Sequence, residues 1–231
     1  MKLTDQIRCI FDDAEAGKPE AALLHACTSI DATAKRLYPS NGAGVRARFV
    51  RCIREYYWLI EPMMGVGLNL EETIFSNVAL PKLKTPPDFA DVVYAIHRNS
   101  HAHGDEVSLS YELLKTTGPY GSQWEMGPDH LRMPDRLIWA LTSVTVFCRE
   151  NFRHRGWGGS RYLTWGEEKF VIADWWGREA DLKPIAATWN TTRVKMEKLE
   201  RLKEAHERGE KGCATLVVAA PHPATKIGSA R

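Results

Sequence analysis

Two stretches of apolar residues at helical spacing constrain the fold of this chain more than any other feature. They occupy residues 19–39 and 45–65 and are bounded by proline and glycine. Apolar side chains recur there every three or four residues, which places them on one face of a helix. The positions on these faces are Ala22, Leu23, Ala26, Cys27, Ile30, Ala34 and Leu37, then Val45, Phe49, Cys52, Ile53, Tyr56, Ile60 and Met63. Because such faces must be buried, the first half of the chain predicts packed helices.

The rest of the chain predicts one more helix in the first half and a mixed second half. We expect a helix over residues 85–104, capped by Thr85 or Asp88 and ended by Gly104. In the second half we expect β-hairpins within about 106–132 and 157–180, the first pairing residues 106–114 with 122–126. We also expect an apolar helix over 133–154 and a long terminal helix over 183–209. The predicted fold class is mainly α, a helical bundle with β-hairpin insertions in the second half.

Domain organisation is predicted to be simple. No internal repeat or clear linker is visible, so residues 1–211 are expected to form a single domain. The tail over residues 212–231 has few large apolar groups and is expected to be loosely ordered. Seven of the eight tryptophans follow residue 120. Tryptophans beside basic residues can stack on single-stranded nucleic acid, but filling the core of thin hairpins is the favoured role.

Composition and the distribution of charge argue against several classes of protein. The formal charge of +2 over 231 residues means that a nucleic-acid-binding function would need clustered basic residues. Five cysteines without C-x-x-C spacing argue against a disulfide framework or a zinc ribbon. Acidic residues interrupt the N-terminal segment, and no apolar run reaches membrane-spanning length. We therefore expect a cytoplasmic protein.

The helix expected over residues 45–65 also carries the clearest basic stripe in the chain. Its members are Arg46, Arg48, Arg51 and Arg54. Arg51 and Glu55 are four residues apart and can form an ion pair. The favoured interpretation of this stripe is a solvated helix face.

The segment "AIHRNSHAHGDEV", residues 95–107, holds three histidines and an arginine at the end of an expected helix. On an ideal helix His103 falls in line with the apolar face, whereas Arg98 and His101 share the opposite face with Asp91 and Tyr94. The apolar face consists of Phe89, Val92, Val93, Ile96 and Ser100.

Two interpretations of this segment follow from the residues alone. His97 and His101 are four residues apart and can share a metal ion. However, the residue after His97 is Arg98, where zinc-protease helices have a carboxylate, and a guanidinium disfavours a dication. In the second interpretation the histidines favour the negative end of the helix dipole, and Arg98 pairs with Asp91 or stacks on Tyr94.

A third interpretation rests on resemblance to a known family. The segment "RNSHAHG" has the form Arg-Asn-x-x-x-His-Gly, which resembles the signature of the HEPN superfamily of helical bundles. The ribonucleases of that family carry an arginine, four to six residues and then a histidine, with a polar residue usually following the arginine. On this resemblance the candidate catalytic residues are Arg98, Asn99 and His103.

The resemblance implies a metal-independent endoribonuclease that uses no cofactor and acts as a homodimer on RNA. It also implies a toxin or defence effector with an antitoxin or a nucleotidyltransferase-like protein as a possible partner. The chemistry fits, because histidine can act as base or acid near neutral pH and arginine can hold two phosphate oxygens. Asn99 could orient a phosphate or the imidazole.

Spacing alone gives this pattern little specificity. Arg149–His154 and Arg201–His206 have the same spacing but lack the asparagine and the glycine. Five residues also place Arg98 and His103 about 140° apart on an ideal helix. A helix end unwound at Gly104, or a two-fold dimer that completes the site from both chains, would bring them together.

Two alternatives to a ribonuclease remain. One is a non-catalytic module of the same fold that binds RNA, a nucleotide or a protein partner. The other is a metal-dependent hydrolase that uses His97, His101 and His103 as ligands.

Overall fold

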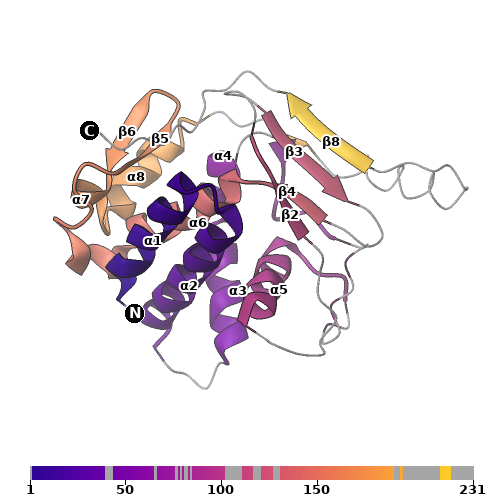
Figure 1. The fold of residues 1–231 in the computed structure, drawn as a ribbon, viewed down its shortest axis with the longest axis horizontal. Coiled ribbons are helices and arrows are strands. Elements are labelled where there is room, and N and C mark those ends of the chain that lie inside the picture. The colour runs from indigo at the N-terminus through magenta and orange to yellow at the C-terminus, as the bar shows by residue number, and fades with distance from the viewer. Residues whose placement is uncertain are drawn as a thin grey trace, which may run out of the picture.

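The computed structural model describes residues 2–39, 44–64, 67–75, 78, 80, 83, 85–101, 111–116, 121–126, 131–189, 193–194 and 214–219. Within these residues the helices form the body of the molecule and a four-stranded sheet lies at one end (Figure 1). The mainly helical fold class, with small sheets in the second half, is therefore confirmed.

The helices follow one another through most of the described chain. They are α1 (Leu3–Glu15), α2 (Pro19–Leu37), α3 (Val45–Glu55), α4 (Tyr57–Met64), α5 (Phe89–His101), α6 (Arg136–Phe147), the 3₁₀ helix η1 (Arg149–His154), α7 (Ile172–Trp175) and α8 (Glu179–Ala186). The strands are β1 (Gly67–Leu68), β2 (Tyr111–Leu114), β3 (Gly121–Met126), β4 (Leu131–Pro134), β5 (Tyr162–Trp165), β6 (Glu168–Val171), β7 (Arg193–Val194) and β8 (Ala214–Ala219).

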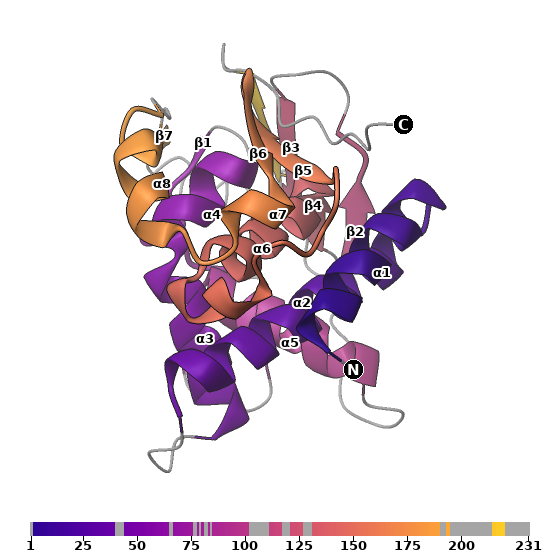
Figure 2. The same ribbon diagram turned by 90° about the vertical axis from the view of Figure 1, so that its left-hand side faces the viewer.

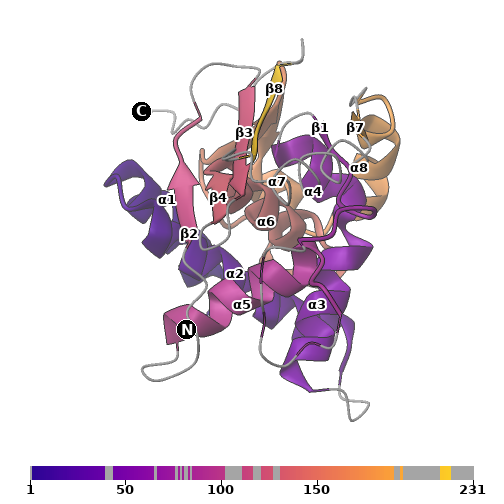
Figure 3. The same cartoon turned by 90° about the vertical axis from the view of Figure 1, so that its right-hand side faces the viewer.

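Helix α6 is the centre of the core. All twelve of its residues are buried, and it packs against α2 and α4. The apolar faces predicted for the first half also point inward: the predicted positions of α2 from Ala22 to Ala34, and those of α3 from Phe49 to Ile53, are buried. Helix α5 lies beside α3 (Figure 3) and also contacts α2.

The helix expected over residues 45–65 is broken at Tyr56. This residue leaves helical geometry with φ −107° and ψ 14°, and its carbonyl accepts the first hydrogen bonds of α4 from Leu59 and Ile60. Its hydroxyl donates to Glu179 of α8 at 2.6 Å. The break turns α4 onto α6, where its apolar residues are buried.

The first predicted hairpin is wrong in its pairing. β2 and β3 are not neighbours, because β4 lies between them in a sheet of order β2-β4-β3-β8. β4 is parallel to β2 and antiparallel to β3. Leu131 and Met133 of β4 are fully buried, and Arg132 of the same strand forms ion pairs with Glu112 of β2 and Glu125 of β3, each at 2.7 Å. Burial of Leu131 and Met133 is consistent with the interior position of β4 in this sheet.

The second predicted hairpin is confirmed. β5 and β6 are antiparallel, with Trp165 opposite Glu168 across a two-residue turn. Gly166 in this turn has φ +57°, which suits glycine. The preference for tryptophans in the core is also confirmed, since Trp124, Trp139, Trp165, Trp176 and Trp189 are all less than 10% exposed.

The long helix expected over residues 183–209 is present only over residues 183–186 of its described part. α8 ends at Ala186, and residues 193–194 form β7, which is parallel to β1 (Figure 2). Trp189 leaves the helix direction to pack on Trp165, with ring centroids 4.6 Å apart, so burial of this ring competes with continued helix. Residues 195–209 lie outside the described part.

In the tail expected to be loosely ordered, residues 214–219 form strand β8 against the edge of β3. The segment "ATLVVA" has the β-branched content typical of strands. The remaining residues of the tail lie outside the described part. No helix among the described residues is long and apolar enough to cross a membrane.

Candidate functional site

Helix α5, which carries the predicted catalytic residues Arg98 and Asn99, is packed as expected along its apolar face. Phe89, Val92, Val93 and Ile96 of α5 are each at most 1% exposed. Arg98 and Asn99 lie in the last turns of this helix, which is described through His101. The side chains of Arg98 and Asn99, together with residues 102–110 and thus His103 and Gly104, lie outside the described part of the chain.

Three ion pairs hold the first turn of α5, and Asp88 just before it, against α3. Asp91 accepts hydrogen bonds from Arg46 and Arg54 on its two carboxylate oxygens, and Arg54 also binds Asp88 at 2.7 Å. Burial, followed by the nearby charge of Asp88, raises the pKa of Asp91. Burial acts to raise the pKa of Asp88 as well, but the hydrogen bond from Arg54 leaves that pKa lowered.

The basic stripe of α3 is therefore only partly a solvated face. Arg46 and Arg54 join α3 to α5, and Arg46 also lies over the ring of Tyr94 at 5.9 Å. The predicted pair of Arg51 and Glu55 is present at 2.8 Å, with both side chains exposed. The stripe is thus largely neutralised by carboxylates of its own chain.

His97 belongs to the interior of the helical body. It is 7% exposed, and its imidazole is stacked on Phe49 of α3 with centroids 5.2 Å apart and planes 6° apart. Tyr94 lies edge-on to the same imidazole. Among the described residues no group of three or more potential metal ligands comes together, and His101 and His103 are not among those whose side chains are described.

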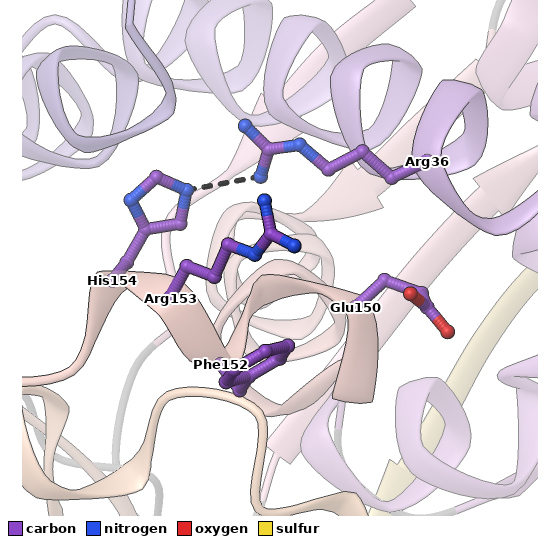
Figure 4. A pocket seen from close by; sticks show the side chains of 5 residues that line it. All are labelled: Arg36, Glu150, Phe152, Arg153 and His154. Carbon is purple, nitrogen blue, oxygen red and sulfur yellow. Dashed lines mark hydrogen bonds between the residues drawn. The ribbon is translucent and has the colours of Figure 1, made fainter.

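A second group of basic residues surrounds a cavity of about 340 Å³ between the end of α2 and η1 (Figure 4). Arg36 contributes from the last turn of α2; Glu150, Phe152, Arg153 and His154 contribute from η1. A cavity of this size is within the ~300–1,000 Å³ usual for small-molecule sites. Figure 4 shows the guanidinium groups of Arg36 and Arg153 directed into the centre of the cavity.

Arg36 is held in place by two neutral acceptors. Its Nη1 donates to Oδ1 of Asn151 at 2.5 Å and contacts Nε2 of His154 at 3.0 Å. A guanidinium can only donate, so Nε2 of His154 is the acceptor and the proton of the neutral imidazole is on Nδ1. Burial, followed by the charge of Arg36, lowers the pKa of His154 and favours this neutral form.

The side chain of Asn151 is itself held by buried hydrogen bonds. It is fully buried, and its amide nitrogen donates to Oγ1 of Thr33 at 3.0 Å and to the carbonyl of Thr145 at 2.8 Å. Those bonds identify the oxygen of the amide as the atom that faces Arg36. A buried network joining α2, α6 and η1 therefore sets the direction of the guanidinium.

The Arg-x(4)-His match at Arg149 to His154 does not bring its two ends together. Arg149 is 72% exposed, pairs with Glu150 at 3.4 Å and does not line the cavity. The basic residues that meet at the cavity are Arg36 and Arg153, which the sequence did not single out. Arg36 lies 115 residues from Asn151, so no local pattern joins them. The only sequence signal was the basic last turn of α2.

Comparison with known proteins gives a family but no activity. The model of the Rv1289 family matches residues 2–202. Uncharacterized proteins Rv1289 and MT1327 of two Mycobacterium tuberculosis strains, and Mb1320 of Mycobacterium bovis, are each 31% identical over 170 residues, covering 72% of this chain and 79% of theirs. No solved structure matches the chain significantly. The chain therefore belongs to the Rv1289 family.

Proposed function

We propose that this protein is a metal-independent endoribonuclease whose catalytic residues are Arg98, Asn99 and His103. The observation that carries the proposal is the Arg-Asn-x-x-x-His-Gly pattern over residues 98–104, at the end of a helix in a mainly helical fold. This is the pattern that resembles the HEPN ribonucleases.

The surroundings of α5 support the proposal in two ways. The helix is anchored by its buried apolar face and by the ion pairs of Asp88 and Asp91, and catalytic groups are best positioned on such rigid elements. In addition, both carboxylate oxygens of Asp91 are already bound by Arg46 and Arg54. The alternative explanation for Arg98 is a structural one, in which it pairs with Asp91. Arginines of α3 already form that pair, so it does not account for Arg98.

The proposed reaction breaks the bond between phosphorus and the 5′-oxygen of the next nucleotide. The 2′-hydroxyl attacks the adjacent phosphate, His103 takes or returns the proton, and a 2′,3′-cyclic phosphate and a 5′-hydroxyl are the products. Arg98 binds the phosphate oxygens as negative charge develops on them. Asn99 orients the phosphate or the imidazole.

The separation of about 140° between Arg98 and His103 on one ideal helix makes a two-fold dimer part of the proposal. In such a dimer Arg98 of one chain acts with His103 of the other. Mixing Arg98→Ala chains with His103→Ala chains would then restore activity in the heterodimers, each of which keeps one complete site.

The direct test incubates the purified protein with RNA in the presence of EDTA. Wild type is expected to cleave RNA but not DNA of the same sequence, whereas Arg98→Ala and His103→Ala are expected to lose at least about 100-fold of the rate. His101→Ala is the matched control, because it removes a neighbouring histidine that only the metal-dependent alternative requires. Activity that persists in both catalytic variants, or acts equally on DNA, contradicts the proposal.

The toxin or defence role extends the same proposal. Induced expression of wild type should arrest growth of a bacterial host, and His103→Ala at equal protein level should not. Binding of RNA without cleavage, unchanged in His103→Ala, would instead favour the non-catalytic module. An antitoxin would be recognised as a co-expressed protein that restores growth and blocks RNA cleavage in vitro.

A further inference from the structure

We propose that the cavity between α2 and η1 binds a small phosphate monoester, with the phosphate between Arg36 and Arg153 and an attached ring on Phe152. This site consists of residues 36, 150 and 152–154 and shares no residue with the proposed ribonuclease site. The inference does not depend on RNA cleavage.

The charges at the cavity call for an anion. Arg36 and Arg153 both reach into it (Figure 4), and within the described part of the chain neither forms an ion pair with a carboxylate. This contrasts with Arg46 and Arg54 of α3, whose charges are matched by Asp88 and Asp91. Two guanidinium groups directed into one cavity repel each other unless an anion lies between them. Their fork of donors suits the several oxygens of a phosphate.

One of the two guanidinium groups is positioned in advance. Arg36 gives one nitrogen to Asn151 and His154, both neutral acceptors, so its positive charge is oriented without being neutralised. The lowered pKa of His154 keeps that imidazole neutral at pH 7. His154 and Asn151 thus act as positioning residues, and the remaining donors of Arg36 are available to a ligand. A prepositioned side chain loses less conformational entropy when it binds.

The rest of the cavity selects what is attached to the phosphate. Phe152 is 50% exposed, and the guanidinium of Arg153 lies 5.8 Å from its ring centroid. An exposed aromatic ring beside the cation is suited to pack against a planar group of the ligand. Glu150 also lines the cavity; its carboxylate is turned away from the two guanidinium groups (Figure 4) and pairs with Arg149, but its negative charge still disfavours a second anionic group of the ligand on that side. The preferred ligand therefore has one phosphate and a neutral ring.

Isothermal titration calorimetry on the full chain measures binding of the probe, phenyl phosphate. Inorganic phosphate and phenol serve as its two partial ligands. Phenyl phosphate is expected to bind more tightly than inorganic phosphate, and phenol is expected not to bind. Arg153→Gln should weaken both phosphate-containing probes by about tenfold or more, the loss expected for a charge-assisted hydrogen bond. Phe152→Leu should weaken phenyl phosphate and leave inorganic phosphate unchanged.

Lys35→Gln is the matched control, because it removes one positive charge beside Arg36 at an exposed side chain that does not line the cavity. Its affinity for phenyl phosphate should stay within about twofold of wild type. Glu150→Gln should tighten binding of both phosphates, since it removes a negative charge that lines the cavity.

Absence of binding to wild type at millimolar phenyl phosphate would overturn the inference. So would an equal loss of affinity in Lys35→Gln and Arg153→Gln, which would indicate attraction by overall charge. Because Arg153 is exposed, its variant is expected to fold, and an unchanged melting temperature checks this. RNA cleavage by Arg153→Gln should equal that of wild type, so the two proposals can fail separately.

Discussion

Replacing Asn151 by alanine should destabilise the protein far more than an ordinary substitution in a six-residue 3₁₀ helix. The side chain is fully buried, donates to Thr33 and Thr145, and accepts from Arg36. Alanine removes all three bonds at once. The carbonyl of Thr145 then loses a partner in the interior, and water cannot readily replace it there.

The size of the effect follows from the three bonds. The two buried neutral bonds contribute about 1 kcal/mol each, and the bond from Arg36 adds about 1 kcal/mol after allowance for solvent around its exposed side chain. The expected loss is therefore about 3 kcal/mol in the free energy of unfolding. For a chain of this length each kcal/mol lowers the melting temperature by about 2–4 °C, so a fall of roughly 6–12 °C is expected.

Differential scanning calorimetry of wild type and Asn151→Ala measures this change. Glu150→Ala is the control on the same 3₁₀ helix, because its side chain is 43% exposed and pairs only with Arg149 among the described residues. It should shift the melting temperature by less than about 2 °C. An equally small shift of the melting temperature in Asn151→Ala would refute the reasoning. Loss of a buried amide with three hydrogen-bond partners must cost more than loss of a surface ion pair.

Three further predictions follow from packing and charge. Gly177→Ala should lose at least about 2 kcal/mol in urea denaturation, because Gly177 has φ +71° and a Cβ there would meet Cα of Phe152 at 2.5 Å; a stability equal to wild type would contradict this close approach. Asp91→Asn should lower the free energy of unfolding by about 1–2 kcal/mol, and by less at high salt, because it breaks ion pairs between α5 and α3. The exposed control Arg51→Ala should lower it by under about 0.5 kcal/mol. Equal losses in the two variants would contradict the assignment of Asp91 to a structural ion pair. The pKa of His154 is lowered from 6.5 in the folded chain. The stability that the neutral imidazole contributes is therefore fully present above pH 6.5 and is lost as the pH falls through the folded pKa. Wild type should therefore lose more stability than His154→Gln between pH 7.5 and 5, and parallel curves would contradict this prediction.

What the sequence predicted correctly is local in origin. The apolar faces of α2, α3 and α5 follow from a repeat of three or four residues, and the β5–β6 hairpin follows from strand-forming residues around a glycine turn. These patterns need only neighbouring residues to be visible. The Arg-Asn-x-x-x-His-Gly pattern over residues 98–104 is also local, so it could be found without a structure, but the catalytic role that it indicates stays a prediction.

What the sequence did not predict depends on contacts between distant segments. Tyr56 ends α3 where its hydroxyl meets Glu179, more than 120 residues later. The place of β4 between β2 and β3 depends on the pairing of β2 with a strand that does not follow it directly in the chain, and α8 ends as Trp189 packs on the β5–β6 hairpin. Helix propensity favours a longer terminal helix by only a few tenths of a kcal/mol for each residue. Burial of the indole ring of Trp189 contributes more than the helix propensity of any one residue there.

The two groups of arginines differ in a way that only the folded chain reveals. Arg46 and Arg54 form part of the most visible basic stripe in the sequence, yet carboxylates of α5 neutralise them, so they hold helices together. Arg36 and Arg153 belong to no stripe, yet they meet at a cavity where neutral side chains orient one of them and no described carboxylate pairs with either. The density of basic residues along the sequence is therefore a poor guide to which arginines lack a counter-charge among the described residues.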